Sequence, residues 1–176
     1  PYHTNDNMMG VHRRSLSSLA AAPCWRDALV AGIKAGQARV PLASTASEGE
    51  VIVRRTLPNN LGVLHVAASQ PLSKETPGNG GLRLWQYDSL ADAELEASRL
   101  GKGMEVKHST FHTGFAGAKV VCAANKPPAE WSAEEKSMLL DETALMLKGM
   151  DGSMYTGCDM NTTTGDMDYL DGKCDY

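Results

Sequence analysis

The sequence predicts an α/β domain in which helices pack on a mixed β-sheet whose first two strands are antiparallel. Two apolar, β-branched runs at 51–56 and 62–68 flank a turn-forming Pro-Asn-Asn cluster at 58–60. Further strand-like segments then alternate with two capped helical patterns, which begin at Ser89 and Ser132. Strands interleaved with helices in this order are typical of sheets covered by helices.

The elements after the first strand pair follow from local signals. A loop rich in Pro and Gly at 71–81 leads into a third short strand at 82–85. Ser89 is a good N-cap, and the helix that it opens has a stripe of apolar residues for burial. This stripe comprises Leu90, Ala93, Ala97 and Leu100. Because glycine weakens helix interiors, we expect Gly101 or Gly103 to end this helix.

The second half of the chain predicts a strand, a helix and a last strand. A buried strand at 119–123 precedes a capping box, Ser-Ala-Glu-Glu, at 132–135. The helix that follows the box carries a leucine-rich stripe and is expected to stop around Gly149 or Gly152. A short strand at 153–157 completes the sheet.

Composition excludes several classes of protein. The chain has 176 residues, 42% of them hydrophobic and 22% charged, with a net charge of −4. These values are ordinary for a globular protein and give no basic footprint for nucleic acid. The apolar runs are too short to cross a bilayer, so no membrane-spanning segment is expected. Four cysteines without CxxC spacing indicate free thiols.

The histidines offer one alternative chemistry. His108 and His112 are four residues apart, the spacing that pairs metal ligands on a helix. They lie in a Ser/Thr/Gly-rich segment without an HExxH pattern or a third carboxylate ligand, and we predict no metal site. His65 is expected to be a strand side chain with a satisfied partner.

Residues 1–47 differ from the rest and predict an N-terminal extension. A basic segment rich in Ser and Ala at 12–23 is typical of organelle transit peptides, which suggests a mitochondrial location. The residues at 25–35 have near-helical apolar spacing. We expect the extension to anchor the chain to a protein partner in an oligomer or larger complex. The alternative is that the short helix docks on the domain's own sheet.

The stretch 101–119 contains the strongest candidate for chemistry. Lys107 and Lys119 are twelve positions apart, separated by small and hydroxyl residues, and Lys119 follows the Gly/Ala run at 114–118. Such a run lets backbone approach a small ligand closely. Two converging ammonium groups would suit an anionic substrate and would lower each other's pKa. The alternative interpretation is two solvated surface lysines.

Several motifs occur in order and at compatible spacings from about residue 48 to the last residue. They are Gly80-Gly81-Leu-Arg-Leu-Trp, Tyr87-Asp88-Ser89, Gly103-Met104-Glu-Val-Lys107, Gly117-Ala-Lys119, Asp159-Met-Asn-Thr and Asp166-Met-Asp168-Tyr. The set resembles the N-terminal, substrate-binding and dimerisation domain of the glutamate/leucine/phenylalanine/valine dehydrogenases. The resemblance covers 48–176 and leaves the extension unmatched.

The resemblance implies roles for the matching residues in oxidative deamination with NAD(P). The lysine matching Lys107 holds the substrate α-carboxylate in that family. The lysine matching Lys119 has a lowered pKa and assists the attack of water, and the aspartate matching Asp159 moves protons at the amino group. Gly80 and Gly81 would expose backbone to the ligand, or simply form a loop turn.

Two further positions bear on the substrate. In the glutamate-specific branch a lysine precedes the Gly-Gly pair and binds the distal carboxylate, whereas this chain has the uncharged Asn79. A neutral or apolar amino acid is therefore expected. Met104 would line the same pocket, or it belongs to the core.

Three departures from the family pattern favour a second hypothesis. Alanines at 116 and 118 replace glycines before Lys119, and Asn161 replaces a glycine after Asp159. No GxGxxG follows a strand, so we expect no NAD(P) to be bound by this chain alone. On this reading the chain is a dehydrogenase-derived, non-catalytic accessory or structural subunit. The alternative is a substrate-binding domain completed by a missing or separate Rossmann domain.

Overall fold

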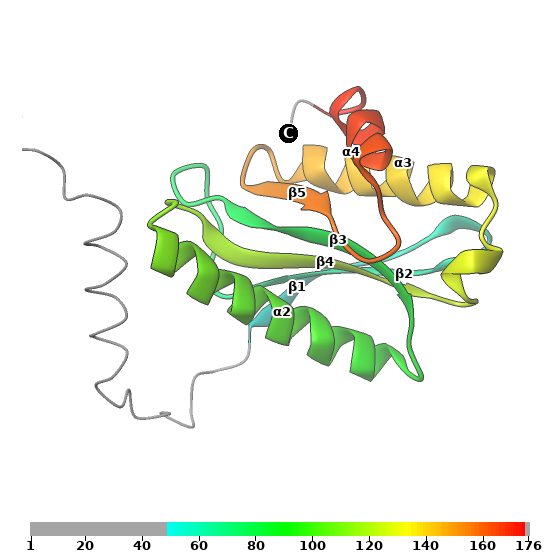
Figure 1. The fold of residues 1–176 in the computed structure, drawn as a ribbon, viewed down its shortest axis with the longest axis horizontal. Helices are drawn as coiled ribbons and strands as arrows, with labels where there is room; N and C mark the ends of the chain where they lie inside the picture. Colours follow the sequence, from blue (N-terminus) through cyan, green and yellow to red (C-terminus); the bar gives the residue numbers. More distant parts are fainter. Residues whose placement is uncertain (1–48, 175–176) are drawn as a thin grey trace, which may run out of the picture. The chain divides into compact units, whose positions relative to one another are not determined.

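The computed structural model describes residues 49–174, which form one layer of β-sheet between two layers of helix (Figure 1). The strands are β1 (Glu50–Thr56), β2 (Gly62–Ala68), β3 (Gly78–Gln86), β4 (Ala116–Ala124) and β5 (Met154–Cys158). The helices are α2 (Leu90–Phe111), α3 (Ala133–Gly149) and α4 (Thr164–Asp171), with short 3-10 turns η1 (Pro58–Asn60) and η2 (Pro128–Glu130).

The sheet is mixed, as the sequence predicts. Its order is β1-β2-β4-β3-β5; the pairs β1–β2 and β2–β4 are antiparallel, and β3 is parallel to both β4 and β5. Helix α2 covers one face, and α3 and α4 cover the other (Figure 1). The larger core lies on the α3 side around Leu82, Val120 and Leu147, which are fully buried.

Helix α2 is longer than expected, because neither Gly101 nor Gly103 ends it. Gly101 lies against the sheet, where an added Cβ would be 3.3 Å from the Ala67 carbonyl oxygen. At Gly117 an added Cβ would be 2.1 Å from the Glu105 nitrogen. Glycine therefore serves close packing of the α2 backbone on the sheet here, and packing outweighs its low helix propensity.

The ends of the other elements also differ from expectation. Strand β3 begins at Gly78 rather than at residue 82, because its first residues pair with β4 and β5 on both sides. Strand β4 extends to residues 116–124 and is buried throughout. The capping box at Ser132 and Glu135 is present and opens α3 as predicted.

His65 is buried in β2, but the prediction that it has a satisfied partner is wrong. Neither ring nitrogen makes a hydrogen bond to any described residue, and the nearest acceptor, Oε1 of Glu94, lies 3.7 Å from Nε2. Burial lowers the pKa of this imidazole, while the Glu94 charge opposes the shift.

Two further expectations concern the N-terminal extension and the absence of a membrane-spanning segment. The helix predicted at 25–35 and the rest of the extension lie outside the described residues. Within residues 49–174 no helix is long and apolar enough to span a membrane.

Candidate functional site

Lys119 lies in the middle of β4, on the face of the sheet that α2 covers. Side chains alternate along a strand, and neighbouring Val120 belongs to the core on the opposite face. The Lys119 side chain is 7% exposed, and its Nζ forms an ion pair with Oδ2 of Asp159. The two residues to which the resemblance gives the acid–base roles are therefore in direct contact.

Asp159 follows β5 in a turn that is bonded to β3. The Asp159 backbone N–H donates to Oγ1 of Thr162 at 2.8 Å, and this hydroxyl donates to the Leu82 carbonyl oxygen at 2.8 Å. Asn161 has a φ of +60° and donates from Nδ2 to the Leu84 carbonyl oxygen at 2.9 Å. Asn is one of the few residues that adopt this left-handed conformation readily, so it can replace the family's glycine here.

The Gly-Gly pair on β3 is close to the two charged residues. An added Cβ at Gly81 would be 2.8 Å from the Asp159 Cβ and 3.2 Å from the Lys119 Nζ. At Gly80 it would be 1.7 Å from the Ala118 carbonyl oxygen, so this glycine permits the approach of β4. Gly81 permits the close approach of the Asp159 and Lys119 side chains, and Gly80 permits that of β4.

Arg83, which the sequence analysis did not single out, completes the cluster. Its Nε donates to Oδ2 of Asp159 at 3.0 Å, and its Nη1 pairs with Glu96 of α2. The sequence did contain a signal for this arrangement. An arginine between Leu82 and Leu84 in a central strand must point to the opposite face and find a carboxylate there.

The surroundings of the two acid–base candidates, Lys119 and Asp159, lower the pKa of each. Burial lowers the pKa of Lys119, the Asp159 carboxylate opposes this, and the Arg83 charge adds to the lowering. Burial raises the pKa of Asp159, but hydrogen bonds from Lys119 and Arg83 outweigh it, and the net pKa is lowered. The carboxylate therefore stays ionised near neutral pH, and the lysine is the group that releases its proton more readily than usual.

Lys107 and Met104 lie on α2, not on the segment after it. Glu96, Leu100 and Lys107 are four and seven residues apart, so they share the flank of α2 that faces Arg83 on β3. Lys107 is exposed, and no contact joins it to Lys119 within residues 49–174. Contrary to the prediction, the cation that lowers the pKa of Lys119 is Arg83 rather than Lys107.

Asn79 lies on β3 between Gly117 of β4 and Tyr155 of β5. Its carbonyl oxygen is 3.2 Å from Nε2 of His108, and the His108 Nδ1 is 2.8 Å from Oγ1 of Thr113. These contacts occupy both ring nitrogens of the buried His108, while His112 forms the exposed C-cap of α2. The two histidines therefore do not form a free pair on a helix face.

Aromatic rings gather beside Asn79. The Phe115 ring lies 5.6 Å from that of His108 and 5.9 Å from that of Tyr155, with an edge-on arrangement in the second pair. These contacts add apolar surface near the uncharged Asn79.

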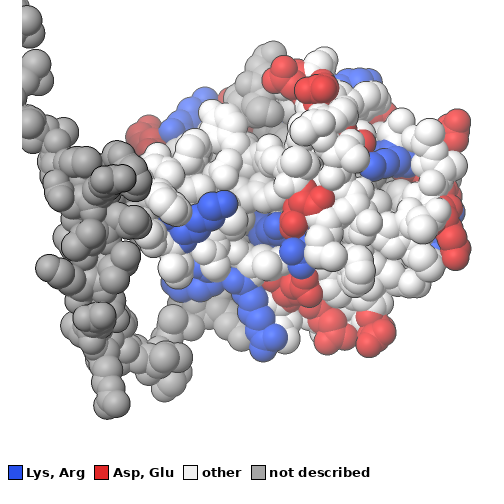
Figure 2. Space-filling view, in the orientation of Figure 1, with Lys and Arg blue, Asp and Glu red and all other residues white. Residues whose placement is uncertain are grey.

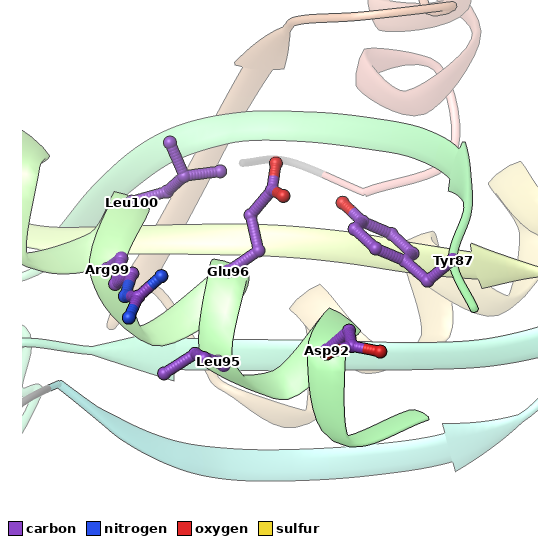
Figure 3. A pocket seen from close by; sticks show the side chains of 6 residues that line it. All are labelled: Tyr87, Asp92, Leu95, Glu96, Arg99 and Leu100. Carbon is purple, nitrogen blue, oxygen red and sulfur yellow. The ribbon is translucent and has the colours of Figure 1, made fainter. Parts of the chain in front are cut away.

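A shallow surface cavity of about 390 Å³ adjoins the Glu96 side chain. It is lined by Tyr87, Asp92, Leu95, Glu96, Arg99 and Leu100. Figure 3 shows the Tyr87 hydroxyl and the Glu96 carboxylate on the same side of α2. The hydroxyl is buried without a hydrogen-bond partner among the described residues. Burial, assisted by the Glu96 charge, raises its pKa to about 12.

The helix termini in the described part of the chain do not fit a dinucleotide. Pyrophosphate binds to free backbone N–H groups at a helix N-terminus after a glycine-rich turn. The first turns of α2, α3 and α4 instead carry Asp92, Glu134 with Glu135, and Asp166. In α3 and α4 the carboxylate of Glu135 or Asp166 also accepts a hydrogen bond from the backbone N–H of the N-cap residue. Negative charge at all three termini would repel a phosphate.

Within residues 49–174, this mixed sheet of five strands with helices on both faces is an α/β fold found in amino-acid dehydrogenases. Residues 48–176 match the model of the Glu/Leu/Phe/Val dehydrogenase dimerisation domain, and the chain belongs to this family. This confirms the resemblance inferred from the ordered motifs.

The relatives are amino-acid dehydrogenases of greater length. Leucine dehydrogenase of Bacillus cereus is 33% identical over 100 residues, 57% of this chain and 26% of the relative. Phenylalanine dehydrogenase of Bacillus thermotolerans is 33% identical over 90 residues, 51% of this chain and 22% of the relative. The crystal structure of L-tryptophan dehydrogenase from Nostoc punctiforme has a TM-score of 0.62 at 22% identity, covering 73% of this chain and 36% of that one. The chain thus spans about a quarter of the curated relatives that it matches.

Proposed function

We propose that residues 48–176 bind the substrate of an NAD(P)-dependent amino-acid dehydrogenase that deaminates a neutral or apolar L-amino acid oxidatively. The observation that carries this proposal is the buried Lys119–Asp159 pair beside Gly81, which brings the two candidate acid–base groups together on one face of the sheet. Because the helix termini described above do not fit a dinucleotide, the NAD(P) would be held by another domain or chain.

The substrate carboxylate is assigned to Lys107. This ammonium group is exposed on the flank of α2 that faces β3, and it can move to meet an anion there. A compact point charge on a flexible stem suits that task. Gly81 adjoins Asp159 and Lys119, and in this proposal the bound amino acid lies between these residues and Lys107.

Proton transfer is assigned to Lys119 and Asp159. Lys119, with its lowered pKa, would take a proton from the water that attacks the α-carbon and would stabilise negative charge there. Asp159, ionised near neutral pH, would accept a proton from the substrate ammonium group before oxidation and return it to the nitrogen as ammonia leaves. Direct contact between the two groups lets them exchange that proton.

The uncharged Asn79 and the half-buried Met104 support a neutral substrate side chain. A distal carboxylate would find no cation at Asn79, whereas the rings of Phe115 and Tyr155 offer apolar contact nearby. The relatives named for leucine, phenylalanine and valine agree with this assignment.

A second candidate function is a non-catalytic accessory or structural subunit of a larger assembly. The observation that favours it is the ion cluster itself, since Arg83 and Lys119 both pair with Asp159 and neutralise it within the chain. The family domain is named for dimerisation, and self-association is part of both proposals. A mitochondrial location stays a prediction from residues 12–23.

Ligand binding separates the two candidates. Backbone amide signals of the isotope-labelled chain would be followed by NMR during titration with L-leucine and, separately, L-glutamate. We expect L-leucine to shift the signals of Gly81, Lys119 and Asp159 at lower concentration than L-glutamate. Lys107→Ala should weaken binding about tenfold, as for the loss of one charged contact.

The matched control is Lys102→Ala, which removes an α2 lysine away from the β3-facing flank and should leave binding unchanged. Absence of any saturable shift with either amino acid would overturn the substrate-binding proposal and leave the accessory role.

A further inference from the structure

One carboxylate oxygen connects three elements of the site. Oδ2 of Asp159 accepts from Nζ of Lys119 on β4 and from Nε of Arg83 on β3, the latter at 3.0 Å. The far side of the Arg83 guanidinium pairs with Glu96 of α2. The Arg83 and Asp159 side chains are 16% and 21% exposed, whereas the Glu96 side chain at the α2 end is 37% exposed.

We propose that Arg83 is a positioning residue that, anchored to α2 by Glu96, fixes the Asp159 carboxylate against Lys119. The proposal rests on the proposed function, in which Lys119 and Asp159 are the reacting groups. It gives Glu96 the secondary role of holding Arg83 in place.

The geometry of the guanidinium group suits this role. Its donors are fixed in a plane and diverge, so Nε and Nη1 can each meet a carboxylate on a different element. A lysine at position 83 would present a single charged atom and could not hold both at once. An arginine buried in a central strand is retained at a desolvation cost, which two carboxylate partners offset.

Arg83 also weakens the attraction of Asp159 for Lys119. Because the same oxygen accepts from both cations, each receives less of its negative charge. After burial, the Arg83 charge is a further cause of the lowered pKa of Lys119, whereas Asp159 and Glu96 raise it. The charge of Arg83 thus lowers the pKa of Lys119, and the charge of Glu96 raises it.

The direction of the shift in the Lys119 pKa distinguishes positioning from a bracing role. If Arg83 and Glu96 only braced α2 against the sheet, losing either contact would admit water and relieve the burial that lowers the Lys119 pKa. Both substitutions would then raise that pKa. If Arg83 positions Asp159, Arg83→Lys keeps the charge but loses the planar donors, so Asp159 moves away from Lys119 and the Lys119 pKa falls. Glu96→Gln lowers it as well, because it releases Arg83 and removes a charge that raises the Lys119 pKa.

The test is an NMR titration of the full chain with lysines labelled at Cε, in which the Lys119 signal is identified by its loss in Lys119→Met. The pKa of Lys119 is read directly, without reference to dehydrogenase activity, so the outcome does not depend on whether the proposed function holds. We expect a downward shift of the Lys119 pKa in Arg83→Lys, which keeps the charge but not the planar donors, and a downward shift in Glu96→Gln.

Arg54→Met is the matched control, because Arg54 also joins a strand to a glutamate of α2, Glu94, but does not contact Asp159. It should leave the Lys119 titration unchanged. Upward shifts in both Arg83→Lys and Glu96→Gln, or an unchanged Lys119 pKa in Arg83→Lys, would overturn the proposal. If Arg83→Lys does not fold, the direction of the Glu96→Gln shift decides the question alone.

Discussion

At the scale of single residues, strand alternation determines which substitutions reach the candidate site. Ala118 is part of the core on the α3 face, and Ala116 shares its parity, whereas Gly117 and Lys119 face α2. The methyl groups of the two alanines therefore point away from the Lys119 side of the sheet. The replacement of the family's glycines by these alanines therefore does not reduce the space on the Lys119 side of the sheet.

His65 yields a prediction about pH. Its pKa is lowered in the folded protein, so the unfolded chain binds a proton more readily. Its contribution to stability is present above the unfolded pKa of about 6.5 and is lost as pH falls through the lower, folded pKa. We expect urea unfolding of wild type to show a loss of stability between about pH 7.5 and pH 5.5 that is smaller in His65→Phe.

The control for this prediction is His112→Asn, which removes an exposed histidine with a φ of +50° and keeps a residue that tolerates this conformation. It should lose as much stability as wild type over the same pH interval. An equal loss in His65→Phe would show that acid sensitivity arises elsewhere.

At the scale of elements, α2 is held to the sheet by a polar contact at one end and an ionic contact at the other. The Glu105 carboxylate accepts from the Gly117 N–H and the Ser69 hydroxyl, each at 2.6 Å, and Glu94 pairs with Arg54 near the N-terminal end. Figure 2 shows acidic side chains towards the right end of α2 and basic side chains towards its left. This order complements the helix dipole.

Two glycines, Gly117 beside α2 and Gly103 within it, should respond oppositely to substitution by alanine. At Gly117 the added Cβ would strike the helix backbone, so we expect Gly117→Ala to cost about 3 kcal/mol or more of unfolding free energy. At Gly103 nothing lies within 4 Å, so Gly103→Ala should add about 1 kcal/mol through helix propensity. Thermal or urea unfolding measures both. Equal changes in the two variants would contradict close packing as the reason for Gly117.

At the scale of the whole molecule, the sequence predicted the class and order of elements because capping and β-branched patterns are local signals. It failed at Gly101 and Gly78, where contacts between distant segments decide the ends of α2 and β3. At the site, Lys119 and Asp159 emerged from the ordered motifs, and the structure brings them together. Arg83 was overlooked because its significance depends on partners 13 and 76 residues away.

The purified chain should have no NAD(P)-dependent activity on any amino acid. The helix N-termini of residues 49–174 present carboxylates where a dinucleotide needs free N–H groups. The measurement is NADH formation with neutral amino acids, with Lys119→Ala as the baseline. Turnover above that baseline would contradict the prediction and locate cofactor binding within the chain.

The turn after β5 is hydrogen-bonded to the Leu82 and Leu84 carbonyl oxygens of β3, and β3 also carries Gly81 and Arg83. The backbone of this part of the site is consequently one unit, to which α2 adds Glu96 as the second partner of Arg83. A protein engineer who transplanted β3 and the 159–162 turn as one piece into another parallel sheet would need to supply two further residues. These are a glutamate on the covering helix and a lysine on the next strand, at the register where Leu82 pairs with Val120 and Lys119 precedes it.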